Sequence, residues 1–202
     1  ISWTLRTSGT TSTLYTLIYA NNTYLAGGAN GGLNTSTDTI TWTLRTSIGF
    51  GLGAITAFTF ANNTYLAGGT SGVLNTSTDA ISWTLRTSGF SGSQIQALTF
   101  ANNTYVATGG SGILNTSTDT IVWILRTSGF GSNQINALTF ANNLYVAGGA
   151  SGALTTSPIA SAGTGGSGVK GGGGGGGGYD EVTNSAGSGG TGGDGYVRIS
   201  WV

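Results

Sequence analysis

The chain has 202 residues, with six basic and six acidic side chains, no net charge, and only 6% charged residues. Nucleic-acid binding depends on clustered Lys and Arg, so this composition excludes it. The absence of Cys and His excludes disulfides, thiolate metal sites and the common nucleophile–base pairs of catalysis. No apolar run approaches the roughly 20 residues of a membrane-spanning helix. A neutral surface rich in Thr, Ser, Asn and Gly suits an uncharged partner such as a sugar, or packing in an assembly.

Internal repetition dominates the sequence. The stretch from Ser36 to Ser47 returns at 77–88 and 117–128, and its second half stands alone at 1–8. Successive tryptophans of these stretches are 39, 41 and 40 residues apart; they are Trp3, Trp42, Trp83 and Trp123. A period near 40 residues is what four short strands and their turns occupy.

In chain order, the first element is Ile1–Arg6, a predicted strand of the tryptophan type that stands apart from any complete unit. Four units follow, and their first strands begin near Leu14, Ile55, Ile95 and Ile135. In each unit, alternating apolar and β-branched residues predict the first strand, Asn-Asn predicts a tight hairpin turn, and Gly residues predict a second turn. A third strand, a Thr-Asp turn and a strand with Trp complete the unit. Because every connection is of hairpin length, each unit is predicted to be a four-stranded antiparallel meander.

The inner strands carry apolar side chains on both faces. In the third unit, Leu98 and Phe100 alternate with Ile95 and Ala97. Such a sheet needs a neighbouring layer on each side, and repetition around an axis supplies both. The sequence therefore predicts an all-β fold, a β-propeller in which each four-stranded sheet is one blade. The alternative is a linear β-solenoid, whose coils are usually shorter than this repeat.

The fourth unit stops matching the others at Pro158, before its own tryptophan strand. One strand is thus missing at the end and one is spare at the start. We therefore predict four blades in residues 1–158, with Ile1–Arg6 closing the ring. Two alternatives stay open: the strand-like Tyr196–Val202 could take the same edge, and a larger ring would form if the chain is a piece of a longer protein with repeats upstream.

Residues 159–202 form a separate, glycine-rich region with eight consecutive glycines at 171–178. Such a run is ordinarily a flexible linker, because ordering glycine costs the most backbone entropy. The alternative is a set of extended, polyproline-II-like passes in which glycine permits close backbone approach. The last residues alternate like a strand, so the region is predicted to end in one.

A Ser-x-Asp-x-x-x-Trp element occurs in three units. Its residues are Ser36, Asp38, Trp42, Ser77, Asp79, Trp83, Ser117, Asp119 and Trp123. The element resembles the Asp-box of sialidase-like (BNR) β-propellers. The resemblance implies a hairpin between the third and fourth strands of a blade, away from any active site, with the carboxylate capping turn amides and the indole in the core. One departure is that Thr39, Ala80 and Thr120 stand where the box usually has glycine.

The catalytic constellations are incomplete, so no catalytic residue is predicted. Sialidases hold a sugar carboxylate with arginines, but Arg45, Arg86 and Arg126 occupy one repeated strand position and would not converge. The only glutamate, Glu181, lies in the glycine-rich region. The box aspartates are copies of one structural position, so no carboxylate pair is placed to flank a glycosidic bond. Neither a metal site nor a cofactor is predicted.

One binding hypothesis rests on residues that recur once per blade beside the first hairpin. They are Asn22, Asn63, Asn103, Asn143, Tyr24, Tyr65, Tyr105 and Tyr145. Amides beside aromatic rings could form one shallow glycan pocket per blade. The competing interpretation is that these are turn residues and packed strand tyrosines.

Residues 163–202, with the pattern at 189–201, resemble the glycine-rich terminus of many phage tail-fibre and adhesin proteins. The combined resemblances imply a non-enzymatic virion or extracellular module that recognises cell-surface glycan or contacts other fibre subunits, with homo-oligomerisation left open. The alternative is a structural decoration or spacer domain without a ligand. A sialidase-type glycoside hydrolase is disfavoured by the missing catalytic set.

Overall fold

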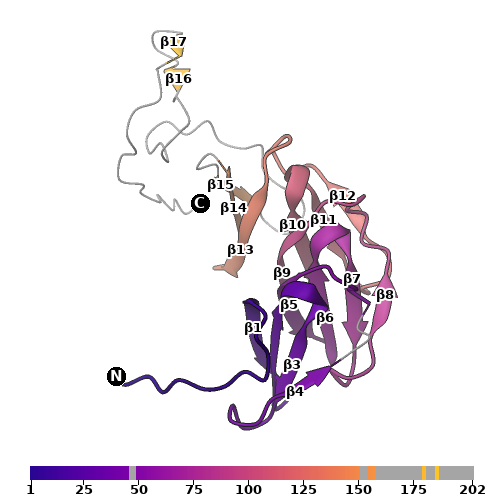
Figure 1. The fold of residues 1–202 in the computed structure, drawn as a ribbon. Helices are drawn as coiled ribbons and strands as arrows, with labels where there is room; N and C mark the ends of the chain where they lie inside the picture. Colours follow the sequence, from indigo (N-terminus) through magenta and orange to yellow (C-terminus); the bar gives the residue numbers. More distant parts are fainter. Residues whose placement is uncertain (46–48, 151–153, 158–178, 181–184, 187–202) are drawn as a thin grey trace.

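The computed structural model of the chain describes residues 1–45, 49–150, 154–157, 179–180 and 185–186. Over this part the chain is all-β: three four-stranded sheets, one three-stranded sheet and a short two-stranded pair (Figure 1). All pairings are antiparallel between strands consecutive in sequence, so the predicted meanders are confirmed. We call the four larger sheets blades 1 to 4.

The strands follow the predicted order. Blade 1 contains β1 (Leu14–Ala20), β2 (Thr23–Gly28), β3 (Leu33–Ser36) and β4 (Thr43–Arg45), and blade 2 contains β5 (Ile55–Ala61), β6 (Thr64–Gly69), β7 (Leu74–Ser77) and β8 (Thr84–Arg86). Blade 3 contains β9 (Ile95–Ala101), β10 (Thr104–Gly109), β11 (Leu114–Ser117) and β12 (Ile124–Arg126). Blade 4 contains β13 (Ile135–Ala141), β14 (Leu144–Gly149) and β15 (Leu154–Ser157). The short pair is β16 (Tyr179–Asp180) and β17 (Ser185–Ala186), and three-residue 3-10 turns follow β2, β6 and β10: η1 (Ala29–Gly31), η2 (Thr70–Gly72) and η3 (Gly110–Gly112).

The Asn-Asn pairs make the first hairpin of every blade. Both residues of each pair have a positive φ; in blade 3, Asn102 has φ 44° and Asn103 has φ 57°. A two-residue hairpin whose twist matches that of its strands needs a positive φ at both positions, and Asn tolerates this conformation better than other side chains. The turn sets the register, so Ala101 pairs with Thr104 and Phe100 with Tyr105.

The blades stack side by side in an arc, with their first strands innermost. β1 packs against β5, β5 against β9 and β9 against β13, while the short fourth strands lie on the outside (Figure 1). A separate apolar cluster fills each junction, with Leu25 and Phe58 between blades 1 and 2, and Leu66 and Tyr105 between blades 2 and 3. Each junction buries one face of a sheet against the next, as a repeated radial stack requires.

The predicted closure of the ring by Ile1–Arg6 is wrong for this structure. These residues form no strand, and the Trp3 side chain is 95% exposed. The sheet of blade 4 is β13-β14-β15 only, without the leading segment. The physical reason is the openness of the arc: β13 does not pack against β1, so the edge of blade 4 is not brought to the segment that precedes blade 1.

Most of the glycine-rich region lies outside the described residues. There the structure gives only the β16–β17 pair, in which Tyr179 is opposite Ala186. The predictions for the glycine run at 171–178 and for a strand at Tyr196–Val202 fall outside the described residues. No helix in the described part of the chain has the length and apolar character needed to cross a membrane.

Candidate functional site

The Ser-x-Asp-x-x-x-Trp elements lie on the hairpins between the third and fourth strands, as the resemblance implied. In blade 2, Ser77 Oγ accepts hydrogen bonds from the amides of Asp79 and Ala80, at 3.2 and 2.8 Å. Asp79 Oδ1 accepts from the amides of Ile81 and Ser82, at 2.8 and 2.7 Å. The boxes at Ser36 to Trp42 and Ser117 to Trp123 repeat this pattern. The box is therefore a turn-capping device built within one blade.

Hydrogen bonding sets the acidity of the box carboxyls. The backbone amide of Ser82, followed by that of Ile81, lowers the pKa of Asp79 from 3.8 to about 2. The backbone amides at the same positions also lower the pKa values of Asp38 and Asp119. A carboxylate that accepts several amide N–H groups is stabilised in its charged form. These groups cap turns, and none is positioned as a proton donor at neutral pH.

The departure from the Asp-box pattern shows in the backbone. Thr39, Ala80 and Thr120, which stand where the box usually has glycine, have φ values of 64°, 60° and 67°. This is the left-handed region that glycine occupies at little cost. The turn geometry is thus retained with a side chain present, at some cost in backbone strain.

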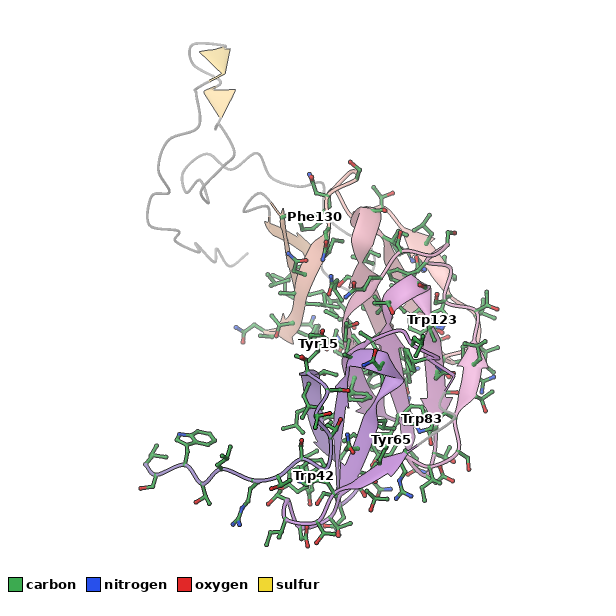
Figure 2. All side chains as sticks on the ribbon, in the orientation of Figure 1. Tyr15, Trp42, Tyr65, Trp83, Trp123 and Phe130 are labelled. Atoms are coloured by element: carbon green, nitrogen blue, oxygen red, sulfur yellow. The ribbon has the colours of Figure 1, made fainter. Side chains whose placement is uncertain are left out.

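The box tryptophans are half-buried and follow one another from blade to blade (Figure 2). Trp83 packs on the cluster between blades 1 and 2, and Trp123 on the cluster between blades 2 and 3. Trp123 Nε1 donates to the carbonyl oxygen of Thr120 at 3.1 Å. The core role predicted for the tryptophans holds for Trp83 and Trp123, whereas Trp3 is exposed.

The recurrent tyrosines are not available to a ligand. Tyr65, Tyr105 and Tyr145 are 1%, 2% and 8% exposed. Each hydroxyl donates to a carbonyl oxygen at the end of the first strand in the preceding blade; Tyr105 Oη lies 2.9 Å from the Ala61 oxygen. The hypothesis of one glycan pocket per blade fails for these residues, because the rings fill the blade junctions. Tyr24, in the first blade, is half-buried and has no preceding blade.

The recurrent asparagines lie exposed at the hairpin tips, where their left-handed φ explains their presence. They are Asn22, Asn63, Asn103 and Asn143. Amides of neighbouring tips meet across blades 3 and 4, where Asn102 Nδ2 donates to Asn143 Oδ1 at 3.0 Å. The structure therefore separates the two halves of the predicted pocket: the amides are outside and the rings are inside.

The repeated arginines stay on separate blades. The Nε atoms of Arg45, Arg86 and Arg126 each donate to a threonine hydroxyl on the adjacent third strand, at 2.9 Å. They lie on the outer strands and do not meet around one point. Among the described residues, no cluster of three or more His, Cys, Asp or Glu side chains is arranged to hold a metal ion.

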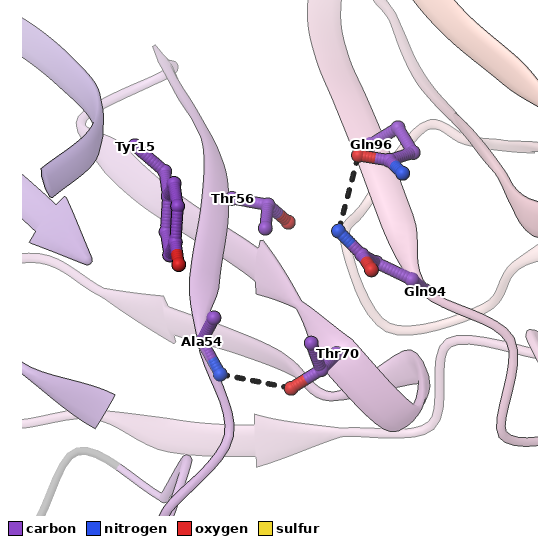
Figure 3. Close-up of a pocket in the computed structure, with 6 residues that line it drawn as sticks. All are labelled: Tyr15, Ala54, Thr56, Thr70, Gln94 and Gln96. Atoms are coloured by element: carbon purple, nitrogen blue, oxygen red, sulfur yellow. Dashed lines mark hydrogen bonds between the residues drawn. The ribbon is translucent and has the colours of Figure 1, made fainter. Parts of the chain in front are cut away.

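A cleft of about 410 Å³ lies where the first strands of three blades begin (Figure 3). Its lining comes from Tyr15, Ala54, Thr56, Thr70, Gln94 and Gln96. All six side chains are uncharged. The Tyr15 ring is 56% exposed, so one aromatic face is open to solvent beside hydroxyl and amide groups.

Internal bonds hold the polar groups of the cleft in place. Gln94 Nε2 donates to Gln96 Oε1 at 3.1 Å, and Thr70 Oγ1 accepts from the Ala54 amide at 2.9 Å (Figure 3). Thr56 Oγ1 donates to the carbonyl oxygen of Ile95 at 2.5 Å and lies 3.3 Å from that of Gly68. Bonds that fix rotamers before binding reduce the entropy that a ligand must overcome.

The cleft was missed because sequence reasoning followed what the repeats share. At the second position of the first strand, the four blades carry four different residues: Tyr15, Thr56, Gln96 and Asn136. The register shift of each first strand falls at this position, where a bulge re-aims the side chain. Variation at one position within near-identical repeats was the available signal.

No protein-family model matches this sequence, and comparison with curated proteins also gives no match. Among solved structures, the computationally designed Ika4 protein gives a TM-score of 0.62 at 22% identity, over 79% of this chain and 99% of that one. YCF48 bound to D1 peptide gives a TM-score of 0.61 at 17% identity, over 75% of this chain and 53% of that one. The fold is a β-propeller. YCF48 from Cyanidioschyzon merolae gives a TM-score of 0.53 at 18% identity, over 73% of this chain and 56% of that one.

This propeller chain spans just over half the length of the YCF48 chains that it matches. At these identities the likeness concerns the fold alone. The tandem antiparallel blades are shared, whereas the residues that line the cleft belong to this chain and have to be argued from their own chemistry.

Proposed function

We propose that this chain is a non-enzymatic, extracellular or virion-borne binding module, and that it recognises an uncharged glycan at the cleft beside Tyr15. One observation carries the proposal: the second residue of the first strand, which differs in every blade, supplies three neutral, hydrogen-bonding or aromatic side chains to the lining of the cleft. Residues that form the turns and the blade junctions are mostly the same in every repeat. The variation of these three residues is therefore consistent with selection for a ligand rather than for packing.

The chemistry of the lining favours a saccharide over other small partners. Amide and hydroxyl groups of Gln94, Gln96 and Thr70 both donate and accept hydrogen bonds, which matches the hydroxyl groups of a sugar. The exposed ring of Tyr15 offers an apolar face with a polar tip. A phosphate or a carboxylate would need a cation, and none of the lining residues is charged.

A binding role also agrees with the placement of the acidic residues. The box aspartates lie on turns at the ends of third strands, and the lining of the cleft contains no carboxylate. Glycoside hydrolysis of the usual kind needs two carboxylates flanking the bond. The resemblance of the glycine-rich terminus to tail-fibre and adhesin proteins supports a virion or extracellular setting, with cell-surface glycan or other fibre subunits as partners.

A glycan array, followed by titration calorimetry on the best ligand, tests the proposal. Tyr15→Ala and Gln96→Ala should each weaken binding by about tenfold or more, since both remove a direct contact. Asn63→Ala is the matched control: it changes a polar side chain on a hairpin tip of blade 2, outside the cleft, and should leave the affinity unchanged. The same panel, assayed for released sugar, should show no hydrolysis.

Two results would overturn the proposal. Binding lost in Asn63→Ala but retained in Tyr15→Ala would return the site to the hairpin tips. Failure of the folded chain to bind any neutral or acidic glycan would favour the alternative, a structural spacer domain without a ligand.

A further inference from the structure

The internal junctions between blades 1 and 2 and between blades 2 and 3 share one set of contacts. In both, a glycine in the second strand of one blade lies against large side chains from the first strand of the next blade, whereas in blade 3 Thr108 stands at the position of this glycine. A Cβ atom at Gly27 would lie 2.7 Å from Ile55 Cγ2, and one at Gly68 would lie 2.7 Å from Ile95 Cγ2. The junction is therefore heterologous, because its two sides are different surfaces.

The arc ends in one free copy of each side. In blade 1, the first strand exposes Leu17 and Tyr19 to 65% and 54%, on the face equivalent to that of Phe58 and Phe60 in blade 2. In blade 4, the first strand exposes Ala137 on the face that would receive a following blade. Among the described residues, no blade covers the face of β1 that would contact a preceding blade or the face of β13 that would contact a following one, whereas a junction of this type forms three times inside the molecule.

The leading segment and the edge of β15 form a second complementary pair. Residues Ile1–Ser8 have the same sequence as Ile81–Ser88, which contains β8 and pairs with β7 as Leu74–Arg86, Asn75–Leu85 and Thr76–Thr84. No strand of the described residues pairs with the outer edge of β15. The same register would place Arg6 opposite Leu154, Leu5 opposite Thr155 and Thr4 opposite Thr156.

The connection between Arg6 and β1 resembles the internal connections between blades in its glycine contact and in its length. In the connections into blades 1 and 3, a glycine lies near a buried asparagine of the blade that follows: a Cβ atom at Gly89 would lie 2.8 Å from Asn115 Nδ2, and one at Gly9 would lie 3.8 Å from Asn34 Oδ1. Seven residues join Arg6 to β1, and eight join Arg86 to β9. The connection from Arg6 to β1 thus resembles the connection from Arg86 to β9 in length and in its glycine contact, so Ile1–Arg6 corresponds in sequence to the fourth strand of a preceding blade.

We propose that, for the 202-residue chain, a second copy supplies that preceding blade. Blade 4 of one copy packs on the open face of blade 1 of the other, and the leading segment of each copy becomes the missing fourth strand in blade 4 of its partner. This interface goes beyond the proposed function and does not depend on it. Two copies bring eight blades into the ring, which is the upper end of the usual range of about four to eight, whereas three copies would exceed it.

One difference between the proposed junction and the internal ones lies in the connection that precedes the first strand. Phe50, Phe90 and Phe130 are buried in the internal connections, and Thr10 stands at the corresponding place in the leading connection. The intermolecular junction therefore buries one aromatic ring fewer. We expect the two copies to separate on dilution while the blades within each copy stay packed.

Cysteine cross-linking tests the pairing directly, because the chain has no native Cys. Opposite residues of antiparallel strands have Cα atoms about 4.5–5.5 Å apart, within the range that a disulfide spans. Chains carrying Leu5→Cys, mixed with chains carrying Thr155→Cys and oxidised, should give a covalent heterodimer, with Leu52→Cys in place of Thr155→Cys as the background control. A heterodimer yield no greater than that control would overturn the proposal, and so would a purely intramolecular disulfide in the double variant Leu5→Cys/Thr155→Cys.

Light scattering on the 202-residue chain gives an independent test. A mass of about twice the 20.1 kDa of one chain is expected at high concentration, and Trp3→Ala should weaken association by at least about tenfold. Because Trp3 is fully exposed in the single chain, its truncation should leave the unfolding midpoint of the dilute monomer unchanged. Leu52→Ala, in another exposed side chain, should change neither quantity. A chain that stays monomeric at every concentration, or a Trp3→Ala variant that associates normally, would contradict the proposal.

Discussion

Two segments of this molecule have the same eight residues and different structures. Ile81–Ser88 supplies β8 and its half-buried Trp83, whereas Ile1–Ser8 forms no strand and exposes Trp3. Local β-propensity is identical in the two segments, so propensity did not decide the outcome. The difference is the presence of a neighbouring strand: β7 pairs with β8 in Ile81–Ser88, whereas no strand of the described residues pairs with Ile1–Ser8. Strand formation here is a property of the site, as expected when cross-strand pairing dominates.

The faces of the sheets show the same contrast between a position with a neighbour and an equivalent position without one. At the internal junctions, Phe58 and Tyr65 are buried between two sheets, while Leu17 and Tyr24, the equivalent residues of blade 1, face no preceding blade. Paired substitutions, one at an internal junction and one at an open end, convert this contrast into measurements. Each pair should be measured on the dilute monomer, so that association does not cover the open faces.

The largest difference is expected at the glycines of the second strands. In Gly68→Ala, the new methyl group would meet the side chain of Ile95 at 2.7 Å, closer than real Cβ contacts, and we expect a loss of about 2 kcal/mol in the free energy of unfolding. Gly148→Ala is the matched change in blade 4, which no following blade covers within the described part of the chain, and should alter stability by less than about 0.5 kcal/mol. Urea unfolding measures both, and equal losses would mean that the free face of blade 4 is packed after all.

A smaller effect is expected from the tyrosine hydroxyls. Tyr105→Phe removes the 2.9 Å hydrogen bond to the Ala61 carbonyl and should cost about 1 kcal/mol. Tyr24→Phe, in blade 1, removes a hydroxyl that has no preceding blade to contact, and should cost less than about 0.3 kcal/mol. Thermal unfolding of the two variants side by side would show the difference, and a Tyr24→Phe loss as large as that of Tyr105→Phe would refute the account of the open face.

Sequence reasoning succeeded wherever the determining interaction is local or lies within one blade. The positive φ of Asn102 and Asn103, the caps made by Ser77 and Asp79, and the limits of the first two strands of blade 3 follow from residue types and spacing. The predicted fourth strand was too long, because it included the tryptophan, whereas β12 begins after Trp123. It failed for the leading strand, because ring closure depends on the angle at each junction summed over the arc. That angle is set by the packing of side chains such as Ile55 on Gly27, which the repeat pattern does not specify.

The candidate site also has parts that the sequence could predict and parts that it could not. The recurrent tyrosines were grouped with the exposed asparagines because both recur beside one hairpin, but strand alternation sends Tyr105 into the junction. The cleft joins Tyr15, Thr56 and Gln96 from three blades, and no segment of sequence contains them together. Only their departure from the repeat marks these positions in the sequence.

The loss of folding stability at low pH should be similar in blade 1 and in the internal blades, because the hydrogen bonds of each box aspartate are made within its own blade. The folded-state pKa of Asp79 is about 2, below its ordinary value of 3.8, so its carboxylate stabilises the fold fully above about pH 4 and ceases to do so as the pH falls through 2. Asp79→Asn should reduce the loss of stability between these pH values, and Asp38→Asn in blade 1 should act in the same direction. Urea midpoints measured across the range test this. An unchanged slope in Asp79→Asn would show that its turn amides do not stabilise the charge.

The smallest effects, and the only ones expected to differ in sign, concern the residue after the box aspartate. Thr39 in blade 1 and Ala80 in blade 2 have left-handed φ values of 64° and 60°, so glycine should relieve strain at both. Ala80 is also buried, in the cluster between blades 1 and 2, and its methyl group is lost in Ala80→Gly. We expect Thr39→Gly to stabilise the monomer by about 0.5 kcal/mol, and Ala80→Gly to be neutral or destabilising, because a buried methyl contributes about 0.8 kcal/mol. If Ala80→Gly stabilises as much as Thr39→Gly, the internal junction does not pack on this residue, and backbone strain alone governs the position.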